Sequence, residues 1–256
     1  MSAPESLGLT GRTIIVTGAA GGIGGAVVRL AVANGMNVLA VDIARERLEA
    51  GMAGVSNPAA VAVHVADLAD TAAIPAIVEA AVARFGRVDG LVHAAAVLKR
   101  QMEITEITEA DWDLQVDVNQ RGTWFLVREV AETLRAQGGG GSIVLFASVG
   151  AYTGGLGGSW IYAATKGAVV TMVRGFARTY APHAIRVNAI SPGTTNTEML
   201  TKDLPPERLD AINAMVPLKR IAEPGEMASV ALFLLSDWAS YVAGVTLDVD
   251  GAWLTR

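Results

Sequence analysis

The sequence predicts a doubly wound α/β fold, in which helices cover both faces of one seven-stranded parallel sheet. Short runs of apolar and β-branched residues alternate along the chain with longer segments of helical period. Most of these runs are apolar on both faces, as expected for strands buried between two layers of helices. Strand–helix alternation is typical of βαβ units, whose right-handed crossovers bring all strand carboxyl ends to one edge of the sheet, where ligands bind.

Each predicted strand is a short apolar run, and a helical segment follows most of them. In chain order the strands are Thr13–Thr17, Asn37–Asp42, Val61–Asp67, Val88–Ala94, Ser142–Ser148, Ile185–Ile190 and Val245–Val249. The helices are expected at about Ile23–Asn34, Thr71–Phe85, Glu109–Gln137, Tyr162–Tyr180 and Pro224–Leu235. Four glycines at 138–141 end the third helix. Residues 194–217 interrupt the alternation, so we expect a substrate loop or lid there, within a single domain spanning residues 1–256.

Composition narrows the class of protein. The chain has 256 residues, of which 52% are hydrophobic and 18% charged. Its net charge of −5 argues against nucleic acid as a partner. No apolar run is long enough to span a membrane, the first residues lack signal-peptide features, and there is no cysteine; together these favour a cytoplasmic protein. The three histidines, His64, His93 and His183, lack metal-ligand spacing, so we expect no metal site.

The first predicted strand is followed at once by a glycine loop. The stretch TIIVTGAAGGIGGAV places Gly18, Gly22 and Gly24 between that strand and a helix start. Glycine lets the backbone approach a ligand closely, and the free N–H groups of a helix N-terminus attract a pyrophosphate. No Gly-Lys-Ser/Thr follows, which excludes a nucleoside triphosphate loop. We therefore expect a dinucleotide site, the alternative being a plain tight turn.

Acidic residues follow the next two strands. Asp42, about 20 residues after the glycine loop, is placed to accept hydrogen bonds from both ribose hydroxyls of an adenosine and to repel a 2′-phosphate. NAD is thus favoured over NADP, although Arg45 and Arg47 could soften that preference. Asp42 could instead, or in addition, cap a helix. At the end of the third strand, the carboxylate of Asp67, beside Leu68, could face the adenine or simply cap a turn.

Tyr162 and Lys166 lie four residues apart in SWIYAATKGAVV. On a helix this spacing puts a phenol and an ammonium on one face, one turn apart. A nearby positive charge lowers the pKa of a phenol from about 10 towards neutral pH. The alternative is an ordinary pair of neighbours on a helix surface.

These residues together resemble the short-chain dehydrogenase/reductase family, in its single-domain, NAD-preferring branch with a Rossmann fold. Six segments in the same order carry the resemblance, over nearly the whole chain. They are Thr17–Gly24 (with Gly18, Gly22, Ile23 and Gly24) for the family's TGxxxGIG, Asn119 in DVNQRGT, Ser148, YAATK for its YxxxK, Ser191-Pro192-Gly193, and Val249-Asp250-Gly251. The family's NNAG appears here as His93-Ala94-Ala95-Ala96, so Ala94 is expected to line the cofactor with backbone only and His93 to be hydrogen-bonded and structural.

The resemblance assigns a role to each matched residue. Tyr162 would be the general acid/base for hydride transfer between a nicotinamide and a secondary alcohol or ketone, and Lys166 would stabilise its phenolate. Ser148 would hold the substrate oxygen, and Asn119 would help to hold a water beside Lys166. Further cofactor contacts would come from Pro192, Gly193, Thr195 and Thr197.

The substrate and the assembly are less constrained. The expected pocket walls are apolar, which favours a secondary alcohol or ketone with an apolar body; they are Val149, Tyr152, Leu156, Trp160, Met199, Leu200 and Met215. Trp160 could instead belong to the core or to a subunit interface. By resemblance, the helices 109–137 and 162–180 pair between subunits of a homotetramer. Two alternatives are a 3-oxoacyl thioester reductase that uses NADPH and a non-catalytic NAD-binding sensor.

Overall fold

A computed structural model describes residues 6–201 and 206–255 and contains one sheet of seven parallel strands. The strands are β1 (Thr13–Thr17), β2 (Asn37–Asp42), β3 (Val61–Val65), β4 (Gly90–His93), β5 (Gly141–Phe146), β6 (Ile185–Pro192) and β7 (Thr246–Val249). Their spatial order is β3-β2-β1-β4-β5-β6-β7, so the order reverses between β1 and β4. This confirms the predicted doubly wound fold and puts a topological switch point, where such sheets bind ligands, beside the glycine loop.

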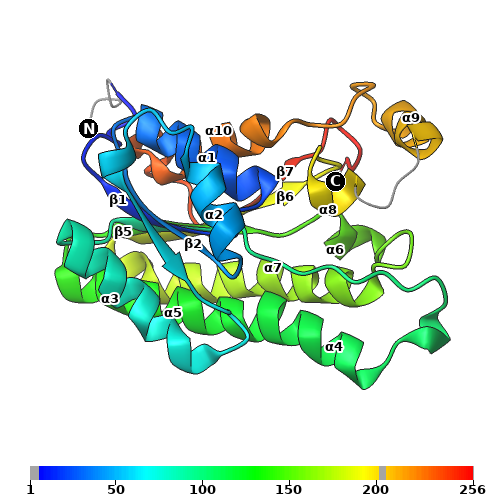
Figure 1. Cartoon of the computed structure of the whole chain (residues 1–256), viewed down its shortest axis with the longest axis horizontal. Coiled ribbons are helices and arrows are strands. Elements are labelled where there is room, and N and C mark those ends of the chain that lie inside the picture. The colour runs from blue at the N-terminus through cyan, green and yellow to red at the C-terminus, as the bar shows by residue number, and fades with distance from the viewer. Residues whose placement is uncertain (1–5, 202–205, 256) are drawn as a thin grey trace.

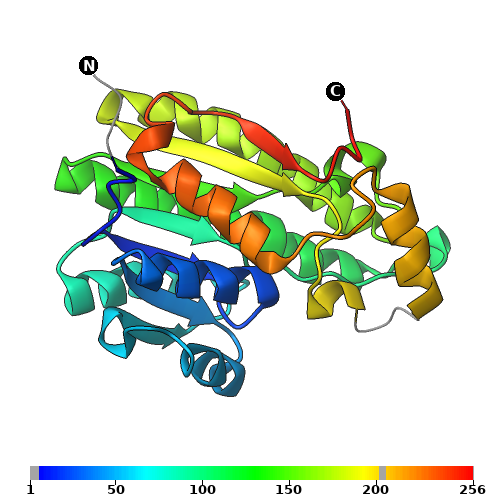
Figure 2. The same cartoon turned by 90° about the horizontal axis from the view of Figure 1, so that it is seen from above.

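Helices cover both faces of the sheet (Figures 1 and 2). On one face lie α1 (Gly22–Ala33), α2 (Arg45–Met52) and α10 (Pro224–Leu235); on the other lie α3 (Ile74–Phe85), α5 (Thr123–Gln137) and α7 (Trp160–Tyr180). Each face has its own core of buried aliphatic side chains. The remaining α-helices are α4 (Glu109–Val116), α6 (Gly150–Thr153), α8 (Glu198–Thr201) and α9 (Pro206–Met215). Across the described part of the chain, no helix has the length and apolarity needed to cross a bilayer.

The predicted helix Glu109–Gln137 is not uniform. Between α4 and α5 the backbone widens into one π-helical segment, Asp117–Gly122, which carries Asn119. A Cβ on Gly122 would lie 2.3 Å from the Leu68 carbonyl oxygen, so this segment packs backbone against backbone after β3. Buried residues continue at helical spacing through the segment, at Val118, Asn119 and Gly122, so the sequence pattern did not reveal the change. Such bulges often lie at functional sites.

Other boundaries also differ from the sequence-based prediction. The strands β3, β4 and β5 end two, one and two residues earlier than expected, so Asp67, Ala94 and Ser148 lie in loops at the carboxyl edge. The prediction missed α2, which buries only Leu48 and Met52 and therefore lacks a long apolar stripe. It also missed α6, α8 and α9; the last two lie within the predicted loop 194–217, of which residues 202–205 lie outside the described residues.

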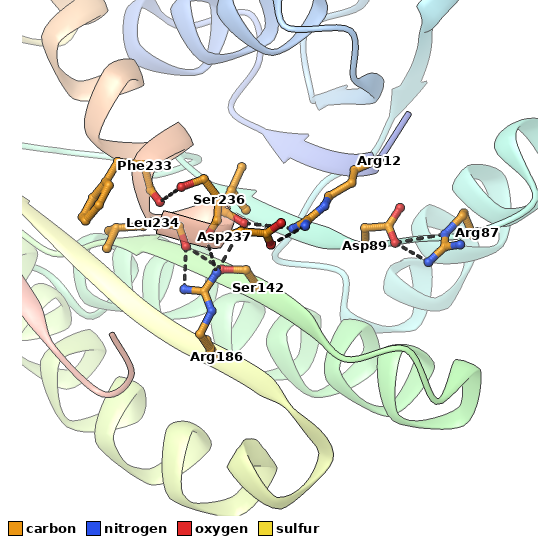
Figure 3. Close-up of polar contacts among 10 residues, drawn as sticks. Arg12, Arg87, Asp89, Ser142, Arg186, Phe233, Leu234, Ser236 and Asp237 are labelled. Atoms are coloured by element: carbon orange, nitrogen blue, oxygen red, sulfur yellow. Dashed lines mark hydrogen bonds and ion pairs between the residues drawn. The ribbon is translucent and has the colours of Figure 1, made fainter. Parts of the chain in front are cut away.

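The amino edge of the sheet is held by contacts of two partly buried arginines, Arg12 and Arg186 (Figure 3). The guanidinium of Arg186, in β6, donates to the carbonyl oxygens of Leu234 at 2.7 Å and Ser236 at 3.1 Å, at the end of α10. Arg12 donates to the Leu235 carbonyl oxygen and pairs with Asp237. These cations satisfy the carbonyl groups that a helix C-terminus leaves without partners.

We expect Arg186→Met to lower the free energy of unfolding by about 2–3 kcal/mol, because it leaves several buried carbonyl groups without a charged donor. Arg186→Lys should recover only part of this loss, because an ammonium cannot reproduce the planar fork of a guanidinium. Urea unfolding of the three proteins measures the effect. Equal midpoints would contradict this account of the amino edge.

Candidate active site

The glycine loop between β1 and α1 is fixed by close backbone contacts. Gly18 has φ of +69°, and a Cβ there would lie 2.6 Å from the Ala95 backbone nitrogen. A Cβ on Gly24 would lie 2.1 Å from the Gly18 carbonyl oxygen. Both positions therefore require glycine, which explains why the loop passes so close to the residues after β4.

The N-terminus of α1 and the loop after β6 face each other. Gly21 is the N-cap of α1 and offers no side chain to the first-turn amides. A Cβ on Gly22 would lie 3.0 Å from the Thr197 methyl carbon, so the two loops are in contact. Since a helix N-terminus without a capping side chain is a site for anions, the residues here fit the pyrophosphate of a dinucleotide.

The carboxylate of Asp42 is held at the end of β2. Its Oδ2 accepts from the Ala20 N–H at 3.0 Å, and its Oδ1 accepts from the Ala44 N–H at 3.2 Å. The N-cap of α2 is Ala44, so Asp42 is not the cap of that helix. Each oxygen keeps acceptor capacity for a ligand hydroxyl. Asp67 accepts from the Ala69 N–H at 2.9 Å, as expected for an aspartate that caps a turn.

Lys166 lies in α7, one turn after Tyr162, and its side chain is buried. Its Nζ donates to the Phe146 carbonyl oxygen at 2.7 Å and lies 5.4 Å from the centroid of the Tyr162 ring. The ammonium thus lies over the ring face while its hydrogen bond goes to the last residue of β5. The pair shares one helix face, as the spacing predicted.

The pKa values of this pair differ from the sequence-based expectation. Burial raises the pKa of Tyr162 to about 12, although the charge of Arg100 acts in the opposite direction. Burial also lowers the pKa of Lys166 to about 8. The pKa of Tyr162 therefore shifts upward, opposite to the direction expected from the sequence, because burial is the largest cause.

Ser148 lies two residues beyond β5, next to the first turn of α7. Its Oγ accepts from the Gly150 N–H at 3.0 Å. A Cβ on Gly150 would lie 3.2 Å from that Oγ and 3.8 Å from the Ala163 methyl group, the residue after Tyr162. Because Gly150 has no side chain, the space between Ser148 Oγ and Ala163, at the start of α7, stays open.

Asn119, in the π-helical segment, joins the loop after β4 to α7. Its Oδ1 accepts from the Val97 N–H and its Nδ2 donates to the Val97 carbonyl oxygen, both at 2.8 Å. The Nδ2 also lies 3.3 Å from the Thr165 Oγ1, which donates to the Tyr162 carbonyl oxygen at 2.8 Å. Asn119 thus holds the segment after β4 against the turn that carries Tyr162 and Lys166.

Several residues around the site were not assigned a role from the sequence. Thr17 and Thr123 hold His93, whose expected hydrogen-bonded role is confirmed. Arg100, on the exposed loop after β4, is the cation whose charge acts on Tyr162. No local motif marks Arg100 or Thr123, since only the fold brings them to this edge.

Comparisons with known proteins agree with this geometry. A family model described as enoyl-(acyl carrier protein) reductase matches residues 18–253. The crystal structure of a Brucella melitensis protein titled short-chain dehydrogenase/reductase, glucose/ribitol dehydrogenase, has a TM-score of 0.90 at 37% identity over 96% of this chain and 98% of that one. The chain belongs to the short-chain dehydrogenase/reductase family.

Curated relatives within the short-chain dehydrogenase/reductase family differ in substrate. The 3-oxoacyl-(acyl-carrier-protein) reductase of Thermotoga maritima is 35% identical over 95% of this chain and 98% of its own length. Levodione reductase of Leifsonia aquatica is 39% identical over 94% of both chains. A 3-ketoacyl-(acyl-carrier-protein) reductase from Brucella melitensis, solved with NADH, has a TM-score of 0.88 at 31% identity over 96% of this chain and 99% of that one. The family comprises oxidoreductases that bind a nicotinamide cofactor. The glycine loop and the Asp42 carboxylate of this chain fit such a cofactor.

Proposed function

We propose that this protein is an NAD-dependent oxidoreductase that transfers a hydride between the cofactor and a secondary alcohol or ketone. One observation supports this most strongly: the Lys166 ammonium lies 5.4 Å from the centroid of the Tyr162 ring and donates to the carbonyl oxygen of Phe146, two residues before Ser148. Phe146 ends β5 at the carboxyl edge of the sheet, which also carries the glycine loop. A non-catalytic NAD-binding sensor would not need a phenol, an ammonium and a hydroxyl at that one place.

The bound nicotinamide would supply the hydride donor or acceptor. The glycine loop would hold the pyrophosphate with Gly18, Gly22, Ile23 and Gly24, Asp42 the adenosine ribose, and Asp67 and Leu68 the adenine. Backbone at Ala94 and the segment from Pro192 and Gly193 through Thr195 to Thr197 would line the nicotinamide end. These positions lie around one edge of the sheet, as one extended ligand requires.

Side chains of the protein would move the substrate proton. The Tyr162 hydroxyl would take the proton of an alcohol, or give one to a ketone oxygen, while Ser148 Oγ holds that oxygen. Lys166 would favour the phenolate electrostatically, because its ammonium lies 5.4 Å from the ring centroid. Asn119 has its side-chain amide fully engaged by Val97 and Thr165, so it would act by fixing the turn between Tyr162 and Lys166.

The charges near Asp42 favour NAD over NADP. Arg45 pairs with Glu49 one turn along α2 at 3.1 Å, and Arg47 pairs with Glu198 of α8 at 2.6 Å. Both arginines that could attract a 2′-phosphate are therefore already matched by carboxylates. Asp42 itself would repel that phosphate.

We expect Asp42→Ser to shift the preference for NAD over NADP towards NADP by about 10–10²-fold, because it removes two charged hydrogen bonds to the ribose and one repulsion. Binding titrations with NAD and NADP measure the shift. Asp70→Ser, which removes an exposed carboxylate that caps a turn after β3, is the control. If the unmodified protein binds NADP as tightly as NAD, the NAD proposal is wrong.

The substrate pocket is proposed to be apolar, with residues 194–217 as its lid. Leu156, Met199 and Met215 are 65%, 43% and 55% exposed, respectively, so three large apolar side chains of the expected walls are available for contact. A relative from Sphingobium indicum, 37% identical to this chain, is named 2,5-dichloro-2,5-cyclohexadiene-1,4-diol dehydrogenase, after a ring-bearing substrate. A panel of cyclic alcohols and open-chain polyols, each with NAD and NADP, together with a 3-oxoacyl thioester assayed with NADH and NADPH, tests the proposal. Activity confined to the thioester with NADPH would support the other candidate, which the Thermotoga maritima relative favours.

A homotetramer is proposed from two separate apolar surfaces. Trp112 and Trp124, on α4 and α5, are 50% and 47% exposed, and Trp238 and Tyr241, before β7, are more exposed still. Two distinct self-complementary surfaces generate a tetramer with dihedral symmetry. Sedimentation of a monomer at micromolar concentration would count against it.

A further inference from the structure

The imidazole of His93 joins three elements inside the protein. His93 ends β4, and its register partner in the neighbouring strand is Thr17, the residue before Gly18. The His93 Nδ1 lies 2.7 Å from Thr17 Oγ1, and the Nε2 lies 2.8 Å from Thr123 Oγ1, at the start of α5. All three side chains are buried, with at most 3% exposure.

The hydrogen-bond partners determine which nitrogen of His93 carries the proton. The Thr123 hydroxyl donates to the Asn119 carbonyl oxygen at 2.7 Å, so its single hydrogen is already used. Thr123 Oγ1 must therefore accept from a protonated Nε2 of His93. The Nδ1 of the neutral ring is then an acceptor, and the Thr17 hydroxyl donates to it. Thr17 thus donates to His93, His93 donates to Thr123, and Thr123 donates to the Asn119 carbonyl oxygen.

The same network continues to the acid/base residue. The Asn119 side chain contacts Thr165 Oγ1, and that hydroxyl holds the Tyr162 carbonyl oxygen. A continuous path of hydrogen bonds thus connects the residue before the glycine loop with the backbone of Tyr162. Each member is buried and held by at least one partner, so a change at one position has few ways to relax.

We propose that His93, fixed as the neutral Nε2–H tautomer between Thr17 and Thr123, is a positioning residue that couples the glycine loop to the turn carrying Asn119, Tyr162 and Lys166. The catalytic part of this proposal rests on the proposed function. His93 does not transfer a proton, since both its nitrogens are occupied by threonine hydroxyls. Its role is to fix the distance between the glycine loop, which would hold the cofactor, and the Asn119 carbonyl. Asn119 in turn holds the start of α7.

The surroundings of His93 keep it uncharged. Burial is the larger cause and the charge of Lys166 the smaller, and together they lower the pKa of His93 to about 3. The groups that contact its ring nitrogens, Thr17 from β1 and Thr123 from α5, are uncharged. A protonated ring would also lose its acceptor for the Thr17 hydroxyl.

The tautomer is tested by nitrogen NMR of the imidazoles in the full-length protein. The chain has only three histidines, so His64→Gln and His183→Gln assign the spectrum while leaving His93 unchanged. We expect His93 to show one protonated Nε2 and one unprotonated Nδ1 throughout the range from about pH 5 to pH 9, since its pKa lies far below the usual value near 6.5. A signal for the Nδ1–H tautomer, or titration within that range, would overturn the assignment. This experiment does not depend on catalysis.

The positioning role is tested with Thr123→Val and Thr123→Ser. Valine has nearly the same shape but breaks the path, whereas serine keeps the hydroxyl. We expect the valine variant to lower kcat about tenfold, which corresponds to one buried hydrogen bond, with KM for the alcohol within about twofold and serine restoring kcat. A valine variant that loses thermal stability but keeps kcat would show a merely structural role and overturn the proposal. If Tyr162→Phe also keeps full turnover, the proposed function fails instead.

Discussion

Tyr162→Phe is expected to lower kcat for a secondary alcohol by a factor of about 10² or more, because it removes the hydroxyl that we propose moves the substrate proton beside Ser148. Affinity for NAD should stay within about twofold, since the ring and the backbone of α7 remain in place. Steady-state rates and a binding titration of the same preparation measure the two quantities. Unchanged turnover would refute the assignment of Tyr162.

Tyr180→Phe is a matched control in the same helix. The Tyr180 hydroxyl donates to Glu132 at 2.7 Å and belongs to the far end of α7, so its loss should leave turnover unchanged. A fall in rate for both variants would point to a general disturbance of α7. A fall for Tyr162→Phe alone would identify the phenol as the reacting group.

The pKa of the Tyr162 phenol can also be tested in the protein without cofactor. Burial raises the pKa of Tyr162 to about 12, so its tyrosinate absorbance, obtained as the difference between the unmodified protein and Tyr162→Phe, should be absent at pH 10. An ultraviolet titration of both proteins measures this. Ionisation near neutral pH without cofactor would contradict the pKa derived from the structure.

The fold could be predicted from the sequence because its strands are continuous apolar runs and its first loop needs glycine. The ends of β1 and β2 agree with the prediction because Gly18 follows one strand and the polar Asp42 ends the other. The bulge at Asn119 could not be predicted, since a π-helical turn in the middle of a helix leaves the apolar pattern almost unchanged. It depends on the contact of Gly122 with Leu68, more than 50 residues away in the chain.

Much of the candidate site was identified from local motifs, but its electrostatics was not. The spacing of Tyr162 and Lys166 gives a shared face and says nothing of how deeply either group is buried. Burial decides both pKa values, and it follows from how α7 packs on β5. The partners of His93 come from β1 and α5, so only the folded chain shows why an imidazole fits where the family has an amide.

Lys166→Met should remove most of the activity and also change how stability depends on pH. Turnover is expected to fall by about 10² or more, because the ammonium beside the Tyr162 ring is lost. In the unmodified protein, burial lowers the pKa of Lys166 from 10.5 to about 8, so keeping the charged form buried costs about 3 kcal/mol at pH 7.

The sign of the pH effect follows from proton linkage. Between about pH 8 and pH 10.5 the unfolded chain holds the Lys166 proton more strongly than the folded one, so the stability of the unmodified protein rises with pH relative to the methionine variant. The difference in free energy of unfolding between the two proteins should therefore shift by about 2–3 kcal/mol between pH 7 and pH 10 in favour of lysine. Urea unfolding at both pH values measures it.

Lys166→Arg provides the control for this effect. A guanidinium stays charged over the whole range, so its difference from methionine should not change between pH 7 and pH 10. The lost contact with the Phe146 carbonyl oxygen affects all pH values alike and does not alter the slope. If lysine and arginine behave identically, Lys166 is not desolvated in the free protein. We expect the methionine variant to be inactive and its stability relative to the lysine protein to be greatest near neutral pH. That result would show that the chain keeps a buried charge at position 166 at a cost to its own stability. Such a cost is expected of a residue that is retained for function.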